Sequence, residues 1–484
     1  MTITLKNFGP IKELTMDLTK NLHLLYGESS VGKSYAAYCV YLLLHELRKL
    51  LWEGSFQMLA IDDIVESLFT QLLGMEREQG KEEVDISGNI AGLLYLGLGD
   101  IIGDRLHPVF RSTFGSSLEQ LDNQFTGKHF SLTLATTVFQ AEFALDNKRK
   151  IFILSNFTML VPLIAKYDSQ AGNGGTCGFD EQGRCVAKSQ KSFASILRTF
   201  TVGYVHATLQ HICSQIYFLP ASHLGLYQMH TSFSPIIAEL AGQRFGLQSK
   251  LQLPSLTALD SDYIQQLAQI QIHEVTSPLT DLAERIEREV VKGSVQFEAQ
   301  TKRIIFQPKD TKIWQEISHV SSMVAALAPF VLFLKYILTS HETAHYRTLS
   351  ESALFQEKMR FAESAIMLIF EEPEAHLHPT AQVKLMEILA ELTKYNVRVM
   401  LTSHSNYMFN KLGNMVLGGE IDETTIQTHH LVMTDEGSID AGDMKLTKDE
   451  ITDENFAEVS EQLYDERVRL YDKLNAEVMH EFEN

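Results

Sequence analysis

Cysteine is scarce in this chain of 484 residues, which has four: Cys39, Cys177, Cys185 and Cys213. None of them shows the CxxC spacing that is typical of a zinc site. Cys177 and Cys185 flank a glycine-containing turn, CGFDEQGRC, so a disulfide or a share in a metal site stays open for this pair. So few thiols in so long a chain suit a reducing compartment, and we expect a cytoplasmic protein.

Long apolar runs are also missing. The N-terminal segment, MTITLKNFGPIKEL, has no apolar signal core. The longest apolar stretch, residues 323–338, contains Pro329 and Lys335 and is shorter than the ~20 residues that span a bilayer. We therefore expect no contact with a membrane.

Positive charge is outweighed by negative charge. The chain has 41 lysines and arginines against 61 aspartates and glutamates, a formal net charge of −20. This balance excludes a protein that coats nucleic acid over its whole surface, although a local basic groove stays open. Residues 434–484 hold 16 acidic and five basic side chains, which fits either a solvated helix or a docking surface.

Low-complexity tracts, internal repeats and sustained heptads are absent, and the hydrophobic content of 45% is enough for a large core. Residues 1–45 and 206–430 alternate strand and helix patterns, which predicts an α/β head split in two along the chain. Residues 46–205 carry amphipathic stretches that we interpret as a mostly helical insertion, and residues 431–484 as an acidic helical C-terminal segment. The helical stretches expected in the insertion are 56–73, 90–102, 138–145 and 153–164.

Short apolar runs predict the strands of the head, and periodic patterns predict its helices. The strands are expected at residues 2–8, 22–26, 215–219, 301–308, 365–370 and 397–402. The helices are expected from residue 34, around 260–282, and at 321–339, 378–395 and 455–478.

One segment matches the phosphate-loop pattern GxxxxGK[ST] in full: Gly27, Glu28, Ser29, Ser30, Val31, Gly32, Lys33 and Ser34. It follows an apolar strand and opens a helix, which is the context that this motif requires. Its glycines let backbone N–H groups surround a phosphate at the helix N-terminus. Lys33 is expected to reach the β- and γ-phosphates of ATP, and the Ser34 hydroxyl to bind Mg²⁺.

A buried strand at 365–370 delivers two adjacent carboxylates, Glu371 and Glu372, at its carboxyl end. Open α/β sheets bind their ligands at that edge. We assign Glu371 to the Mg²⁺ and Glu372 to the attacking water as its general base. The next strand, 397–402, ends in Ser403-His404-Ser405, and His404 is expected to sense the γ-phosphate or the water.

Two serines, Ser321 and Ser322, stand at the start of a predicted helix. Their hydroxyls and the unpaired N–H groups suit either an anion site or an ordinary helix cap. His376 and His378 allow a metal pair or a dimer contact, and we favour the dimer contact because no further ligand is near in the sequence.

Together these residues resemble the ABC-type ATPases of the SMC, RecF and OLD kind. The sequence EEPEAHLHP is similar to that of prokaryotic AAA-type ATPases, which include the ATPase components of the Septu and PARIS antiphage systems. LKNFGPI resembles the first strand of that group, and LPASHLGL resembles its LPAxRxGL segment with His223 in place of the usual arginine. SSMVAALAP looks like its short signature. The resemblance covers residues 1–45 and 215–410.

The resemblance implies that two heads sandwich two ATP molecules, so that Ser321 and Ser322 act in trans and His404 is the switch histidine. The signature lacks the glycine pair of transporters, which puts closure in trans in doubt. Glu371 replaces the usual aspartate. The resemblance also implies a homodimer or larger homo-oligomer. It further implies a separate effector, because the part after His404 has no room for the nuclease domain that OLD-type proteins append.

The first functional hypothesis is therefore a dimeric, ATP-hydrolysing regulator or sensor that controls an effector, plausibly a nuclease, in antiphage defence. The alternative is a DNA repair or recombination ATPase that binds duplex DNA, with Lys148, Arg149, Lys150, Lys302 and Arg303 as the basic clusters. A scaffold that binds ATP and hydrolyses little is a third reading.

Overall fold

The computed structural model describes most of the head and parts of the segment between its two halves. The described residues are 1–52, 83–115, 117–146, 151–160, 162, 164–167, 178–179, 185–187, 215–229, 231, 256–272, 276–339, 365–452 and 461–473. The expected helix at 56–73, the side chains of Cys177 and Cys213, and the cluster Lys148, Arg149 and Lys150 lie outside them.

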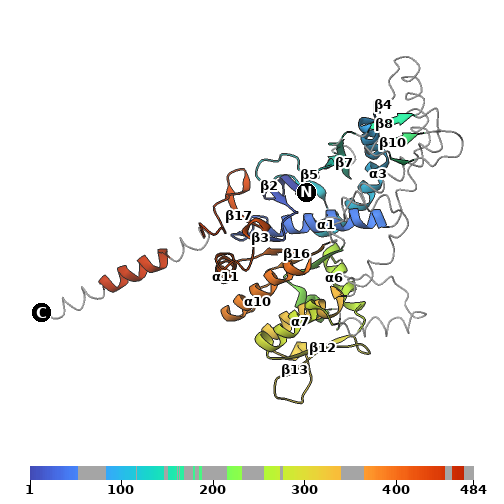
Figure 1. The fold of residues 1–484 in the computed structure, drawn as a ribbon. Helices are drawn as coiled ribbons and strands as arrows, with labels where there is room; N and C mark the ends of the chain where they lie inside the picture. The colour runs from blue at the N-terminus through green and yellow to red at the C-terminus, as the bar shows by residue number, and fades with distance from the viewer. Residues whose placement is uncertain are drawn as a thin grey trace, which may run out of the picture.

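One 11-stranded sheet organises the molecule (Figure 1). Five neighbouring strands run parallel: β11 (Gln215–Leu219), β15 (Ile366–Glu371), β16 (Val397–Thr402), β3 (Leu22–Gly27) and β17 (Ile426–Thr434). Because they are parallel, their carboxyl ends meet at one edge of the sheet. That edge receives the residues that follow β3, β15 and β16, which are the three predicted site segments.

The sheet continues beyond β17 with strands from both ends of the chain. The order is β18 (Gly437–Asp440), β2 (Ile11–Asp17), β1 (Thr2–Phe8), β5 (Ser131–Ala135), β6 (Phe139–Asp146) and β7 (Ile151–Met159). β18 pairs with β2 in parallel, and the rest of this half is antiparallel. The N-terminal and C-terminal parts of the chain therefore share one sheet.

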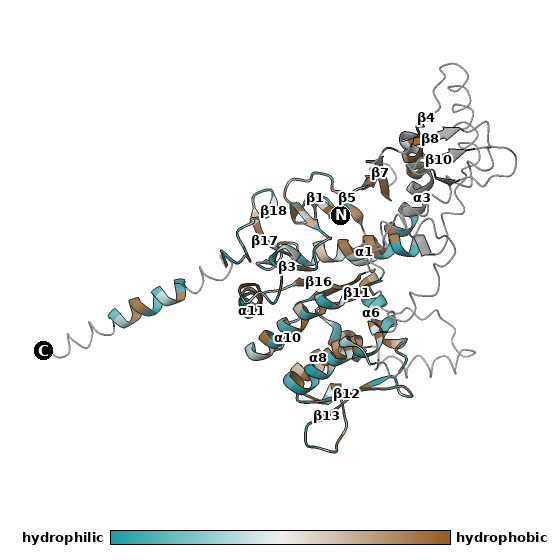
Figure 2. Ribbon diagram, viewed as in Figure 1, coloured by the Kyte–Doolittle hydropathy of each residue, from teal (hydrophilic) through white to brown (hydrophobic). Residues whose placement is uncertain are grey.

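Helices cover both faces of the parallel strands. Helix α1 (Lys33–Trp52) packs on one face, in a core that also takes side chains of β1, β2 and α3 (Ser87–Phe114). Helices α8 (Ser322–Leu332), α10 (Pro379–Leu392) and α11 (Asn406–Leu417) pack on the other. All six residues of β3 and of β15 are buried, as expected for strands covered on both faces. Figure 2 shows hydrophobic residues concentrated on these central strands and on α1.

A smaller lobe lies beside α8 and α10. It contains α6 (Ala258–Ala268), α7 (Pro278–Ile286), the π-helical turn η3 (Glu287–Val291) and a three-stranded sheet of β12 (Gly293–Glu298), β13 (Arg303–Pro308) and β14 (Gln315–Glu316). The short helices η4 (Ile317–His319) and η5 (Phe333–Ile337) flank α8. A 3-10 turn, η8 (Thr393–Tyr395), follows α10, and another, η9 (Glu423–Thr425), precedes β17.

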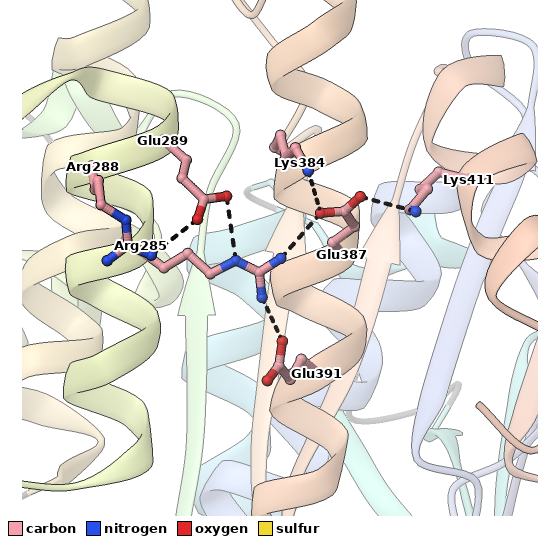
Figure 3. A network of polar contacts seen from close by, with 7 residues as sticks. All are labelled: Arg285, Arg288, Glu289, Lys384, Glu387, Glu391 and Lys411. Atoms are coloured by element: carbon pink, nitrogen blue, oxygen red, sulfur yellow. Dashed lines mark hydrogen bonds and ion pairs between the residues drawn. The ribbon is translucent and has the colours of Figure 1, made fainter. Parts of the chain in front are cut away.

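Ion pairs tie the lobe to the helices on the sheet (Figure 3). Arg285 of α7 contacts Glu387 at 3.1 Å and Glu391 at 2.7 Å, both on α10. Glu387 also contacts Lys384 of α10 and Lys411 of α11, each at 2.9 Å. These carboxylates raise the pKa of Arg285 against the opposing effect of burial. The network crosses three helices and fixes α7 against α10.

The interpretation of residues 46–205 as mostly helical is wrong for two of its stretches. Residues 138–145 and 153–164 fall on β6 and β7, which extend the main sheet, while the stretch at 90–102 lies in α3 as predicted. The reason is visible in β6, where Phe139, Ala141, Phe143 and Leu145 are buried in strict alternation, the period of a strand. A 3-10 turn, η2 (Leu118–Leu121), and a separate sheet of β4 (Glu83–Asp85), β8 (Ile164–Tyr167), β10 (Cys185–Ala187) and β9 (Gly178–Phe179) complete this segment.

The predicted boundary at residue 430 is also wrong, because β17 runs through it and β18 follows in the same sheet. The head therefore continues at least to Asp440. Beyond it, residues 461–473 form the expected helix, which extends away from the body in Figure 1 and has every side chain exposed. Among the described residues no helix is long and apolar enough to cross a membrane.

The other predicted elements are present with small shifts at their ends. Strands β1, β3, β11, β13, β15 and β16 and helices α1, α6, α7, α8 and α10 occupy the expected places, whereas α11 was not predicted. The predicted α/β class is confirmed by the parallel core with helices on both faces.

Candidate functional site

The loop between β3 and α1 has the backbone of a phosphate-binding turn. Gly27, Ser30 and Gly32 adopt positive φ angles of 132°, 69° and 99°. A Cβ on Gly27 would lie 2.3 Å from the Leu431 carbonyl oxygen, and one on Gly32 would lie 2.6 Å from the Ile11 side chain. Only glycine therefore fits at these two positions, and the glycines of the motif are explained by crowding as well as by dihedral angle.

Lys33 begins α1 and folds back over this loop. Its ammonium donates to the carbonyls of Gly27 at 2.9 Å and Glu28 at 2.7 Å, and the residue is only 6% exposed. Burial lowers the pKa of Lys33, and the nearby carboxylates of Glu372 and Glu374 oppose that effect. The cation is thus held inside the loop and faces the acidic end of β15.

Glu371, the last residue of β15, lies beside the start of α1. Its Oε2 accepts a hydrogen bond from the Tyr38 hydroxyl at 3.1 Å and one from the Ala221 N–H at 3.3 Å. The Ser34 side chain also hydrogen-bonds to this carboxylate and lowers its pKa, although burial, the larger effect, raises it. The structure therefore brings Ser34 and Glu371 together, as the sequence predicts.

Glu372 points into a different environment from its neighbour. Its backbone has φ of 43°, a left-handed conformation that is uncommon outside glycine, and its N–H donates to the Thr402 carbonyl at 2.9 Å. The side chain remains 44% exposed, and its Oε1 lies 3.9 Å from His404 Nε2. Two adjacent carboxylates thus lie one in the interior and one at an open edge.

The loop after β16 is fastened to the loop after β15 by Glu374. The backbone N–H of His404 donates to Glu374 Oε1 at 2.5 Å, and the Ser403 side chain bonds to the same carboxylate. Burial raises the pKa of Glu374, and its Oε2 is buried with no hydrogen-bond partner among the described residues. Burial and Lys33 lower the pKa of His404, so its ring is neutral at neutral pH.

Ser321 and Ser322 lie apart from these groups. Ser321 caps α8, with its Oγ accepting the Val324 N–H at 3.5 Å, and both serines are exposed. In the part of the chain that the structure describes, no bond joins them to the loop at 27–34. His376 and His378 are exposed as well, and the described residues contain no group of three or more His, Cys, Asp or Glu that could hold a metal ion.

The residues at the sheet edge fit a magnesium nucleotide. The glycine-turned loop and the Lys33 ammonium suit phosphates, and Ser34 with Glu371 offers hydroxyl and carboxylate oxygens, the ligands that Mg²⁺ prefers. The unpaired Oε2 of Glu374 adds a buried acceptor close to Lys33. The Tyr38 hydroxyl and the Ala221 N–H both donate to Oε2 of Glu371 and hold this carboxylate in place. Its side chain is one methylene longer than the aspartate that is usual in the family that the sequence resembles.

Three residues of this region were missed from the sequence. Tyr38 lies one helical turn after Ser34, so the spacing of four residues placed it on the same face and could have revealed it. Glu374 is the third acid of EEPEA, and only the first two, Glu371 and Glu372, were assigned a role from the sequence. Ser438, whose hydroxyl donates to the Val31 carbonyl at 2.6 Å from β18, carries no signal because 407 positions separate the two residues.

Comparisons with known proteins agree with this geometry. The family model of the AAA ATPase domain matches residues 262–409. That segment is similar to AAA ATPase domains. The match contains both glutamates, the two serines and His404, and it confirms the predicted resemblance at the level of the ATPase domain. The phosphate loop lies outside the matched residues. No curated protein matches the sequence.

Several solved SMC heads are similar over most of the chain at low identity. An Smc head bound to the C-terminal winged-helix domain of ScpA has 10% identity and a TM-score of 0.37, covering 90% of this chain and 95% of its own. The Smc head with an extended coiled coil bound to the C-terminal domain of ScpA from Pyrococcus furiosus has 9% identity and a TM-score of 0.36, covering 90% and 94%. The SMC head domain from Thermotoga maritima has 10% identity and a TM-score of 0.31, covering 90% and 96%.

Proposed function

We propose that this protein binds ATP at the edge where β3, β15 and β16 end and hydrolyses it there. The observation that carries the proposal is the convergence of segments more than 330 residues apart, since Tyr38 of α1 bonds to Glu371 with a sequence separation of 333. Lys33 and the loop at 27–34 bind the phosphates. The AAA ATPase match supports the same activity.

The two carboxylates divide the work by their environments. Ser34 and Glu371 would hold Mg²⁺, which would neutralise charge on the phosphates. Glu372, exposed and beside His404, accepts a proton from the attacking water. His404, neutral at neutral pH, presents a ring nitrogen to the γ-phosphate or to that water. Lys33 stabilises the charge on the β- and γ-phosphates.

Substituting Glu372 by Gln tests this assignment. The amide keeps the size of the side chain and loses its basicity, so we expect turnover to fall at least ~100-fold while ATP binding is retained. ATP hydrolysis and the dissociation constant for ATP are measured on the purified chain. Glu420→Gln, an exposed acid beyond α11, is the matched control and keeps parent turnover. Unchanged turnover in Glu372→Gln rejects the role of this carboxylate.

We further propose that two protomers close around two ATP molecules, with Ser321 and Ser322 of one reaching the nucleotide of the other. The support is that both serines are exposed at a helix N-terminus, where an anion is stabilised, and that no hydrogen bond among the described residues joins them to the loop of their own protomer. Light scattering on Glu372→Gln, with and without ATP, should show a dimer only with ATP. The absence of any mass change argues against the sandwich.

The biological role that we propose is a dimeric regulator or sensor controlling a separate effector, plausibly a nuclease, in antiphage defence. Its support is the resemblance of EEPEAHLHP to defence ATPases. An effector gene beside this one favours the proposal. The alternative, a repair ATPase on duplex DNA, predicts a mobility shift that weakens steeply with salt. Of its nominated cations, Lys302 lies over the Phe297 ring and Arg303 contacts Glu316 at 3.0 Å, so part of that cluster is already engaged.

A further inference from the structure

The turn that follows β11 contacts both the metal side of the site and the helix that carries the two serines. Its first contact is the Ala221 N–H, which donates to Glu371 Oε2 at 3.3 Å. The turn is closed by the His223 N–H, which donates to the Pro220 carbonyl at 3.0 Å. Only Ser222 lies between Ala221, whose N–H holds the carboxylate, and His223.

The His223 ring completes the connection. It is 4% exposed, with Nδ1 at 2.8 Å from the Pro220 carbonyl oxygen and Nε2 at 2.7 Å from the Ala326 carbonyl oxygen. Ala326 belongs to α8, about one turn after the serines. Tyr263 and Phe370 pack against the ring nearly edge-on, at 6.5 and 5.8 Å between centroids. The imidazole is therefore fixed in direction and joins two main-chain segments 103 residues apart.

The carbonyl that His223 reaches lies in the turn of α8 before its proline. Pro329 stands inside this helix, three residues after Ala326. Proline has no N–H to donate to the carbonyl four residues back, here Ala325, so this turn of the helix lacks one bond, and the contact from His223 at the adjacent Ala326 adds one from outside the helix. Since carbonyl oxygens only accept, the position requires a side chain that donates, and a hydrophobic residue of the same shape leaves Ala326 without this bond.

We propose that His223 is a positioning residue that sets the orientation of α8, and with it Ser321 and Ser322, relative to the Glu371 carboxylate. The bridge runs from Glu371 through the Ala221 N–H and the turn to His223, and from there to the backbone of α8. It deepens the proposed function, on which it rests, by assigning a residue that touches neither nucleotide nor metal. Without the His223 bridge, ATP still binds at the Lys33 loop, but Ser321 and Ser322 are no longer oriented for the proposed ATP-bound dimer.

Three variants of the full chain separate this role from plain core packing. His223→Phe keeps an aromatic ring and removes both ring nitrogens, including the Nε2 that contacts the Ala326 carbonyl. His223→Arg restores donors at the position where related sequences are expected to carry arginine. Tyr263→Phe alters the same pocket without touching the bridge, because the Tyr263 hydroxyl is buried and has no hydrogen-bond partner among the described residues.

For hydrolysis, we expect His223→Phe to keep the dissociation constant for ATP within about twofold of the parent and to lower kcat by about tenfold, the effect of one lost hydrogen bond. His223→Arg recovers most of that loss, and Tyr263→Phe keeps the parent kcat. A parent-like kcat in His223→Phe overturns the proposal, and so does a loss of ATP affinity in proportion to kcat.

Hydrogen exchange without nucleotide tests the same bridge independently of activity. Amides of α8 should exchange about tenfold faster in His223→Phe, with those of α10 unchanged. If the parent hydrolyses no ATP, the proposed function fails while this measurement still decides the bridge, and equal exchange in α8 rejects it. Should His223→Phe not fold, His223→Leu takes its place, because it also lacks a donor: faster exchange in α8 supports the bridge, and parent exchange overturns it.

Discussion

At the scale of the residue, the site depends on two neighbouring glutamates that leave the same strand in different directions. Glu371 ends β15 in the interior, and Glu372 turns outward because its backbone takes a left-handed conformation that Thr402 holds through the N–H of Glu372. Such a conformation costs about 1–3 kcal/mol and persists where the surroundings enforce it. The pair is thereby divided into a buried carboxylate, to which we assign the metal, and an accessible one, to which we assign the water.

Tyr38 gives a prediction at this scale. Tyr38→Phe removes only the hydroxyl that donates to Glu371 Oε2, so we expect the Mg²⁺ concentration for half-maximal turnover to rise about 10- to 100-fold, the range of one hydrogen bond to a charged group. Affinity for ATP in the absence of metal should not change. Turnover is measured across a magnesium titration.

The matched control is Tyr35→Phe. Tyr35 lies on the same helix, and its ring packs against Phe8 and Phe114. This variant should titrate with Mg²⁺ like the parent. If the magnesium titration of Tyr38→Phe matches that of the parent, the hydrogen bond from Tyr38 to Glu371 has no role in the proposed metal site.

At the scale of the element, the nucleotide loop is supported from the C-terminal side of the chain. The Ser438 hydroxyl of β18 donates to the Val31 carbonyl, and the backbone of β17 at Leu431 lies directly behind Gly27. Local sequence predicted the loop itself because its pattern and its flanking strand and helix are contiguous. It could not predict this support, since pairing between distant strands leaves no local period. The error at β6 was of another kind, because its alternating pattern is present in the sequence and was interpreted as helical.

Ser438→Ala tests the support. Ser438 is fully buried, and removing its hydroxyl leaves a buried carbonyl unpaired, so we expect about 1–3 kcal/mol lower free energy of unfolding and weaker binding of ATP. Urea denaturation gives the first quantity and calorimetric titration the second. Ser294→Ala on β12 is the control, because that serine is exposed and its loss should cost little. Parent values in Ser438→Ala mean that β18 does not brace the loop.

At the scale of the whole molecule, strands from the N-terminal and C-terminal parts of the chain are interleaved in one sheet. β3 lies between β16 and β17, and β18 lies between β17 and β2. The predicted α/β head was correct in class because buried apolar runs next to phosphate-loop and carboxylate motifs identify a parallel core. Its C-terminal limit was wrong because the acidic composition of residues 434–484 masked a short strand that precedes the exposed helix.

Two truncations test whether the head ends at residue 430 or includes β18. A chain ending at residue 452 loses the exposed helix at 461–473 and should melt within about 2 °C of the full chain, since exposed residues contribute little to stability. A chain ending at residue 430 loses β18 and part of β17, which opens the sheet between β17 and β2, and should not fold. Circular dichroism melts and soluble yield measure both. A cooperative, parent-like melt of the shorter chain contradicts the boundary.

The place of β3 also determines when an ATP-binding pocket can exist during synthesis. The phosphate loop is translated long before β16 and β17, the neighbours on either side of its strand. Such long-range pairing delays folding until the distant partners arrive. A nascent chain therefore carries the phosphate loop without its pocket until β16 and β17 have been translated.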